Sequence, residues 1–283
     1  LEFFIFPEKV ETVPTYAFFH CESLLSVTFL GKVTSLESYA FQYCTNLQNI
    51  SIPESVQKIG IGLFSYSGLK SITIPICMTS IENRMFYRCP NLSTVIFLGN
   101  LTSISDGGFY NCPSLLSISL PESLTSIGSY VFGYCNFRTF SIPENVEEIE
   151  SMTFTDCVNL ETITIPEKVG YIDNELFFNC INLQSIQILA NITSIGSYSF
   201  CNCEKLQSIS IPESVTAIFE LAFCNCSSLE TLIIPANVST IETYAFAGCD
   251  SLSYVLYLGE KNPTYGDEIF YDTDIDVVYV TPK

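Results

Sequence analysis

The chain has 283 residues, of which 48% are hydrophobic and 14% charged, and its formal net charge at pH 7 is −19. This charge argues against a nucleic-acid-binding protein, for which a clustered basic face is expected, and against adsorption to anionic lipid. No apolar run approaches the roughly 18 residues that a membrane-spanning helix needs, so no membrane insertion is predicted within this sequence.

One phenylalanine recurs every 22 to 24 residues along the chain. Its twelve positions are Phe18, Phe41, Phe64, Phe86, Phe109, Phe132, Phe154, Phe177, Phe200, Phe223, Phe246 and Phe270. A fixed period of this length indicates a solenoid, whose core is a thin column to which each coil adds a slice. We therefore predict a right-handed, mainly β repeat solenoid of about twelve coils of 22–24 residues, with a parallel β-sheet along one face.

The chain begins with LEFFIFP, the strand half of a repeat without an initiator Met, which predicts a fragment that starts at a repeat boundary. The repeat is clearest at Leu47 to Phe64, which reads LxxIxIPxxVxxIxxxxF. Alternating apolar residues that end in Pro predict a short strand with one buried face. The following VxxIxxxxF segment predicts a second extended or short-strand side, because it leaves no room for a long helix.

The outward positions of the predicted strands carry mostly Ser and Thr, no charge, and apolar residues only at the C-terminal end. One interpretation is structural, because Thr suits a pleated surface and Ser is small and neutral. The other is a flat hydrogen-bonding face for a glycan or an extended protein, with an aromatic and aliphatic anchor. The candidate ligand-binding residues are Thr139, Thr162, Thr164, Thr231, Tyr254, Leu256 and Tyr279, with Val277 beside them.

Ten of the thirteen cysteines lie three residues after the repeat phenylalanine. They are Cys21, Cys44, Cys89, Cys112, Cys135, Cys157, Cys180, Cys203, Cys226 and Cys249. Side chains stacked about 4.8 Å apart are too far apart for the Cβ separation of a disulfide, so we predict a ladder of free, buried thiols. Ser67 and Thr273 fill the other two places of the ladder, which fits unpaired thiols.

Cys201 and Cys224 lie outside this ladder, in CNC segments of adjacent coils. Three interpretations remain: ordinary substitutions, one surface disulfide, or, with the neighbouring ladder cysteines, a tetrathiolate zinc site. The spacing is not the CxxC of familiar zinc sites, so we predict no metal. Cys77 has no assigned role.

The strings at Ile211 to Phe223, Leu120 to Cys135 and Ile192 to Cys203 resemble BspA-like leucine-rich repeats of the Treponema pallidum type. The resemblance covers the whole chain and implies a leucine-rich-repeat solenoid. Residues 250–283 depart from the repeat and resemble the closing repeat of trichomonad BspA-like proteins, which implies surface display and adhesion. We predict repeats over residues 1–249 and a divergent capping repeat over 250–283, since a last coil needs cover.

Catalytic signals are weak. His20 is the single histidine, the carboxylates Glu147, Glu148 and Glu150 fall on predicted exposed turns, and no phosphate-binding or metalloprotease motif occurs. The file formed by Glu122, Glu144 and Glu167 offers too few ligands for Ca²⁺ and suits a solvated edge. No enzyme activity and no cofactor are predicted.

Glycosylation sequons at Asn100, Asn191 and Asn237 share one place in the repeat, on a predicted exposed turn. The resulting prediction is a non-enzymatic cell-surface or extracellular module that binds protein or glycan. The alternative is an intracellular or cytoplasmic structural scaffold, for which rigidity and reduced cysteines suffice. Nothing in the sequence predicts an oligomeric state.

Overall fold

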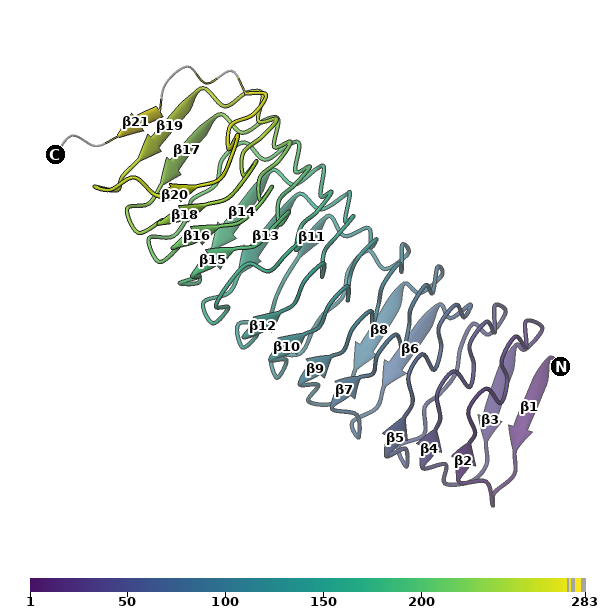
Figure 1. The fold of residues 1–283 in the computed structure, drawn as a ribbon. Helices are drawn as coiled ribbons and strands as arrows, with labels where there is room; N and C mark the ends of the chain where they lie inside the picture. Colours follow the sequence, from purple (N-terminus) through teal and green to yellow (C-terminus); the bar gives the residue numbers. More distant parts are fainter. Residues whose placement is uncertain (274, 276–277, 281–283) are drawn as a thin grey trace. The chain divides into compact units, whose positions relative to one another are not determined.

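The computed structural model describes residues 1–273, 275 and 278–280, in two compact units, unit 1 (Leu1–Asn136) and unit 2 (Phe137–Lys283). The described residues form a parallel β-solenoid of about 11 turns without a helix, close to the predicted number of coils. Most coils have a strand of up to four residues and a two-residue strand, and each has a run of turns around the repeat phenylalanine, which we call the turn side (Figure 1). This confirms the predicted β-solenoid and its second short-strand side.

In unit 1 the longer strands form one row and the two-residue strands another. The longer strands are β1 (Phe3–Phe6), β3 (Ser26–Phe29), β6 (Ser71–Ile74) and β8 (Thr94–Phe97). The two-residue strands are β2 (Thr12–Val13), β4 (Ser35–Leu36), β5 (Lys58–Ile59), β7 (Ser80–Ile81), β9 (Ser103–Ile104) and β10 (Ser126–Ile127).

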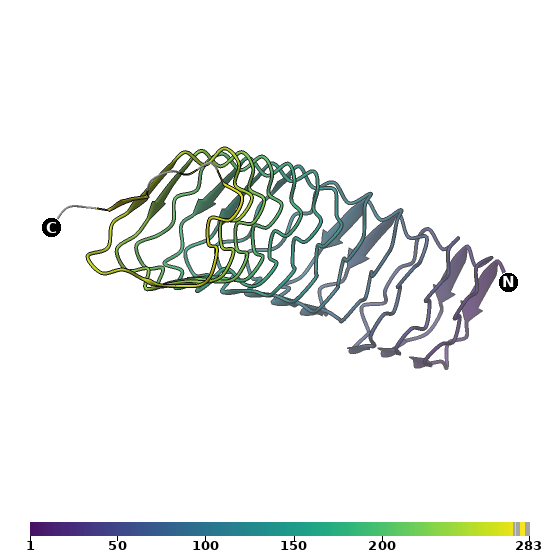
Figure 2. The same cartoon turned by 45° about the horizontal axis from the view of Figure 1, so that its top comes forward.

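Unit 2 repeats this arrangement. One row contains β11 (Thr139–Phe140), β13 (Thr162–Ile165), β14 (Ser185–Ile188), β17 (Thr231–Ile234), β19 (Tyr254–Tyr257) and β21 (Val278–Val280). The other contains β12 (Glu148–Ile149), β15 (Ser194–Ile195), β16 (Ala217–Ile218), β18 (Thr240–Ile241) and β20 (Thr264–Tyr265). The strands of neighbouring coils run in the same direction in both rows (Figure 2).

Strand pairs place equivalent residues of neighbouring coils opposite each other. In β13 and β14, for example, Ile163 pairs with Ile186 and Ile165 with Ile188. A parallel ladder holds such pairs at a constant spacing, so the apolar side chains stack in files beneath the sheet. This confirms the in-register stacking that the repeat predicts.

The predicted continuous sheet is wrong in detail, because three coils have no strand at the expected place, namely residues 47–52, 115–120 and 206–211. All three carry only Asn or Ser at both outward positions, whereas nearly every paired strand carries an outward Thr, Ile, Phe or Tyr; β14, with Ser and Gln, is the exception. Ser and Asn favour pleated structure less than β-branched and aromatic residues, so these coils stay extended without completing the ladder.

The same three coils share a second feature, the sequence Pro-Glu-Ser after the extended segment. The serine hydroxyl donates a hydrogen bond of 2.7 Å to a carbonyl of the preceding coil in each case: Ser55 to Val33, Ser123 to Leu101 and Ser214 to Ile192. These bonds hold each of the three coils to the preceding coil, in place of the missing strand pairing.

The turn side holds two left-handed residues in every coil, two positions before and two after the phenylalanine. Around Phe18 they are Tyr16 (φ 59°) and His20 (φ 58°). The left-handed conformation costs a non-glycine residue about 1–2 kcal/mol. The N–H groups of all three residues donate to carbonyls of the next coil at 2.8–3.2 Å, and these bonds offset the strain.

The repeat phenylalanines form two files of nearly parallel rings, one in each unit. Ring centroids of neighbours lie 5.3 to 5.9 Å apart in unit 1 and 5.1 to 5.6 Å apart in unit 2. The rings of Phe41 to Phe246 are fully buried. Offset stacking of this kind adds to the stabilisation from burial, so the file is the centre of the core.

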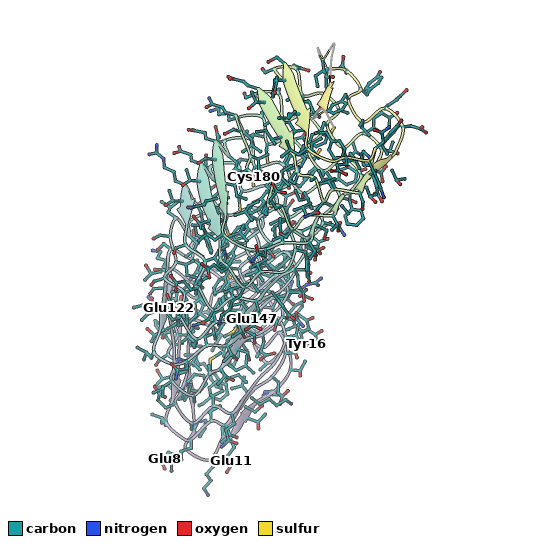
Figure 3. All side chains as sticks on the ribbon, turned by 90° about the vertical axis from the view of Figure 1, so that its left-hand side faces the viewer. Glu8, Glu11, Tyr16, Glu122, Glu147 and Cys180 are labelled. Atoms are coloured by element: carbon teal, nitrogen blue, oxygen red, sulfur yellow. The ribbon has the colours of Figure 1, made fainter. Side chains whose placement is uncertain are left out.

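The ladder cysteines lie beside these rings as free thiols, buried in every coil except at Cys21, which is partly exposed. Eight of these thiols donate a hydrogen bond to the carbonyl of the phenylalanine in the preceding coil, as Cys180 does to Phe154 at 3.2 Å. The others within a unit are Cys44, Cys89, Cys112, Cys135, Cys203, Cys226 and Cys249, at 3.1 to 3.3 Å. Figure 3 shows Cys180 within the body of the coils.

Burial raises the pKa of the eight thiols that make this hydrogen bond, to about 11 at Cys89 and about 12 at Cys135. In an unfolded chain a thiol titrates near pH 8.5. The stabilisation from keeping these thiols protonated is therefore complete below about pH 8.5 and is lost as the pH rises toward the folded values.

We predict that the free energy of unfolding falls between pH 8.5 and 10.5, by up to about 1.4 kcal/mol per thiol and pH unit. Urea unfolding at pH 7.5, 9 and 10 measures it. Cys135→Ser, which copies the natural Ser67, is expected to show a shallower pH dependence. Equal slopes in both proteins would contradict the assignment.

Candidate binding face

The outward side chains of the longer strands form a surface that we call the strand face. Thr139, Thr162 and Thr231 are exposed on it and Thr164 is half-buried. None of the outward positions of these strands carries a charge. A partner that docks here would therefore not have to desolvate an ionised group on this face.

An apolar cluster lies where β17 and β19 pair. Register places Thr231 beside Tyr254 and Ile233 beside Leu256, and we call these four residues the anchor patch. Ile233 is 50% exposed and Tyr254 38% exposed. Aromatic and large aliphatic side chains exposed together on a rigid sheet are the usual centre of a protein contact.

Of two further predicted anchor residues, the structure describes the backbone of Tyr279 and nothing of Val277. The backbone of Tyr279 in β21 pairs with Leu256, so this position continues the anchor row, but its side chain lies outside the described residues. Val277 also lies outside them. Ile233 is the main addition to the predicted residues, and an outward Ile beside Tyr254 and Leu256 is a signal that the sequence contains.

A groove borders the anchor patch where the coil at residues 206–211 fails to pair with β17. The cavity there measures about 340 Å³ and is lined by Ser208, Ile209, Ser210, Ile211, Glu213, Thr231, Ile233 and Pro235. This volume is at the lower end of the range for small ligand sites, roughly 300–1,000 Å³. The groove exists because two outward serines replace the residues that would complete the ladder.

The prediction that apolar residues occupy only the C-terminal end of the strand face is wrong. In unit 1, Phe3 is 63% exposed, Ile5 59% and Ile96 50%. Alternate residues of a strand point outward whatever their polarity, and β-branched and aromatic residues stabilise the strand even on its outer face. In unit 2 the hydroxyl-rich character is strongest over β11 and β13, away from these residues.

The single histidine, His20, lies at the surface of unit 1. His20 stacks on Tyr43 with ring centroids 4.3 Å apart, and its Nδ1 lies 3.5 Å from Oε1 of Glu22 at the surface. Among the described residues, no group of three or more His, Cys, Asp and Glu side chains could hold a metal ion. No helix in that part of the chain is long and apolar enough to cross a bilayer.

Cys201 and Cys224 lie on the turn side of adjacent coils, where Asn202 N–H donates to the Cys224 carbonyl at 2.8 Å. Their thiols hydrogen-bond each other, and this contact together with burial raises the pKa of Cys201. Both are free thiols in the structure.

The three sequon asparagines, Asn100, Asn191 and Asn237, are all exposed. The amide of Asn237 donates to the Glu213 carbonyl at 2.7 Å. Asn225, in a fourth sequon, donates its amide to Asn202 at 2.8 Å. The side-chain amide nitrogens of Asn237 and Asn225 are therefore already engaged in hydrogen bonds.

Comparison with known families identifies the repeat. The model of the BspA type leucine rich repeat region (6 copies) matches residues 1–115, 79–191, 102–218 and 170–283. The chain belongs to the BspA-type leucine-rich repeat family. The resemblance in the repeat sequence is thus confirmed, and solenoids of this family are repeat scaffolds whose extended surfaces mediate contacts. A search of curated proteins finds no match for this BspA-type chain.

Solved structures share this fold. A leucine-rich repeat protein from Bacteroides ovatus is 26% identical, with a TM-score of 0.79 over 96% of this chain and 76% of that one. A leucine rich cell surface protein from Faecalibacterium prausnitzii is 28% identical, with a TM-score of 0.60 over 94% and 79% of the two chains. A leucine-rich repeat protein from Eubacterium ventriosum is 21% identical, with a TM-score of 0.69 over 100% and 85%.

We predict that iodoacetamide at pH 8 modifies Cys77 of the native BspA-type chain well before any ladder cysteine, because Cys77 is exposed and Cys112 is fully buried. Peptide mass spectrometry after timed quenching measures the order. Addition of urea serves as the control and is expected to make all sites react at similar rates. Labelling of Cys112 as fast as Cys77 without urea would contradict the buried ladder.

Proposed function

We propose that this BspA-type chain is a non-enzymatic cell-surface module whose strand face binds an extended segment of a partner protein or a glycan. The observation that carries the proposal is the uncharged strand face with its exposed anchor patch and adjoining groove. Parallel coils hold this surface rigid, so little conformational entropy is lost when a partner docks.

Surface display is supported by the likeness to the cell surface protein of Faecalibacterium prausnitzii and by the exposed sequons. One observation favours the second candidate, an intracellular scaffold: all thirteen cysteines are free, as is usual in reducing compartments. The ladder geometry explains ten of these free thiols in either compartment, so we favour the surface module.

We predict that protease treatment of intact source cells cleaves the protein and that its intact mass includes hexose units. Asn100 and Asn191 are expected to be modified most, Asn237 less because its amide is bonded to Glu213, and Asn225 least. Glycopeptide mass spectrometry gives the occupancy of each site. An unmodified chain that intact cells protect from protease would favour the intracellular scaffold.

We predict that Ile233→Glu and Tyr254→Ala each weaken partner binding at least about tenfold, because they charge or remove the anchor at the centre of the contact. Binding of labelled chain to intact cells that the source organism contacts is the measurement. Pretreating the cells with protease or with glycosidase separates protein from glycan partners.

Ser251→Glu is the matched control, since it places the same charge on an exposed serine outside the strand face. Its binding is expected to equal that of the unmodified chain. Equal binding of the two anchor variants would remove the strand face as the site.

A further inference from the structure

The turn side of unit 1 contains a second cavity, which has no part in the strand face. It measures about 420 Å³ and surrounds Gly107, with Arg84, Tyr87, Asp106, Tyr110, Ser129 and Tyr130 as its lining. In Figure 3, Tyr16 marks the turn side and Glu122 lies at the opposite margin of unit 1. None of the residues that line this cavity belongs to the strand face.

The cavity exists because glycine occupies the left-handed position two residues before Phe109. The neighbouring coils have Arg84 and Tyr130 at this position, so Gly107 interrupts a file of large side chains. A Cβ added at Gly107 would meet its nearest neighbours, Arg84 Cγ and Tyr87 Cδ2, at 3.4 Å. Space for a side chain is thus present but unfilled.

The other two left-handed glycines do not open such a space. At Gly62 an added Cβ would lie 2.5 Å from the ring of Tyr39, and at Gly248 it would lie 2.3 Å from Oδ1 of Asn225. Neighbouring side chains fill both gaps. Among the left-handed glycines of the described residues, Gly107 therefore stands apart in leaving its gap to solvent.

The walls of the cavity are aromatic. Tyr87 and Tyr110 stack with centroids 4.9 Å apart and planes 8° apart, and Tyr130 stands edge-on to Tyr110 at 76°. The guanidinium carbon of Arg84 lies 5.5 Å from the centre of the Tyr87 ring. This contact orients the guanidinium beside the opening while leaving its N–H groups able to donate.

Two arginines lie at or near the rim of the cavity, although the chain as a whole has a net charge of −19. Arg84 is exposed and makes no salt bridge within the described residues, and Arg88 of the same coil lies over Tyr87 at 5.6 Å. On the other side Oδ1 of Asp106 accepts a hydrogen bond from Ser129 N–H at 3.1 Å, which fixes the carboxylate at the rim. The site thus offers the N–H donors of the Arg84 guanidinium, the carboxylate of Asp106 as an acceptor, and the aromatic rings of the tyrosines.

We propose that this cavity binds a monosaccharide unit that carries a carboxylate, such as a hexuronic acid. A sugar ring presents C–H groups to the tyrosines and hydroxyl donors to Asp106, and its carboxylate matches the Arg84 guanidinium in a bidentate pair. A phosphate dianion carries more negative charge than a carboxylate and is therefore repelled more strongly by Asp106. The cavity volume is within the range of small-ligand sites, roughly 300–1,000 Å³.

The test compares methyl β-glucuronide with methyl β-glucoside, which has a hydroxymethyl group in place of the carboxylate at C6, and with inorganic phosphate, by saturation-transfer NMR and titration calorimetry. The glucuronide is expected to bind at least tenfold more tightly than the glucoside and than phosphate. Arg84→Gln is expected to abolish that preference. Absence of glucuronide binding, equal binding of glucoside, or equal binding of phosphate overturns the proposal.

Gly107→Tyr should fill the cavity and reduce glucuronide binding at least tenfold. The fold is expected to accept it, because Tyr16, Tyr39 and Tyr130 occupy the same left-handed position in other coils. Leu221→Tyr, at the same position in unit 2, is the matched control and should bind the glucuronide like the unmodified chain. Unchanged binding by a folded Gly107→Tyr protein, with circular dichroism as the check, also overturns the proposal.

Discussion

The backbone hydrogen bonds between turn sides are the constraint on which the structure depends. In every coil that is followed by another within its unit, the phenylalanine and the residues two positions before and after it donate N–H groups to the next coil, as Tyr16, Phe18 and His20 do. These bonds recur where the strand ladder is missing, as between Gly62, Phe64 and Tyr66 and the following coil. The strands can therefore vary in sequence and in pairing without loss of the stack.

This constraint also determines which side chains are free to carry function. The left-handed residues flanking the phenylalanine project from the turn side in files, and their chemistry changes between units. In unit 1, Tyr43 and Tyr66 stack at 4.5 Å. In unit 2 the same position holds an amide file in which Asn202 donates to Asn179 at 3.1 Å and Asn225 to Asn202 at 2.8 Å. One backbone thus presents aromatic rings in one unit and amides in the other.

The periodic residues predicted the fold well, because burial of Phe, Cys and the strand Ile residues is a property of every coil. The Pro-terminated strands, the absence of long helices and the free ladder thiols all follow from spacing. The left-handed residues could not be predicted, since Tyr, Asn, Arg and Glu occupy those positions without a common sequence signal. The interruptions of the sheet depend on small differences in strand propensity between Ser and Thr, which matter only when neighbouring coils are compared.

The candidate sites arise where the repeat departs from its template, and this explains why sequence reasoning located them only in part. Two outward serines at Ser208 and Ser210 leave a groove beside β17, and one glycine at Gly107 leaves a cavity on the turn side. At Gly107 the residues at the same place in the neighbouring coils, Arg84 and Tyr130, are larger, and beside β17 the strand pairing that would close the groove is missing. A solenoid has no single cleft created by its topology, so concave sites on it come from such local omissions. The proposed binding sites of this chain therefore lie at exceptions to the repeat, while the repeat itself supplies rigidity.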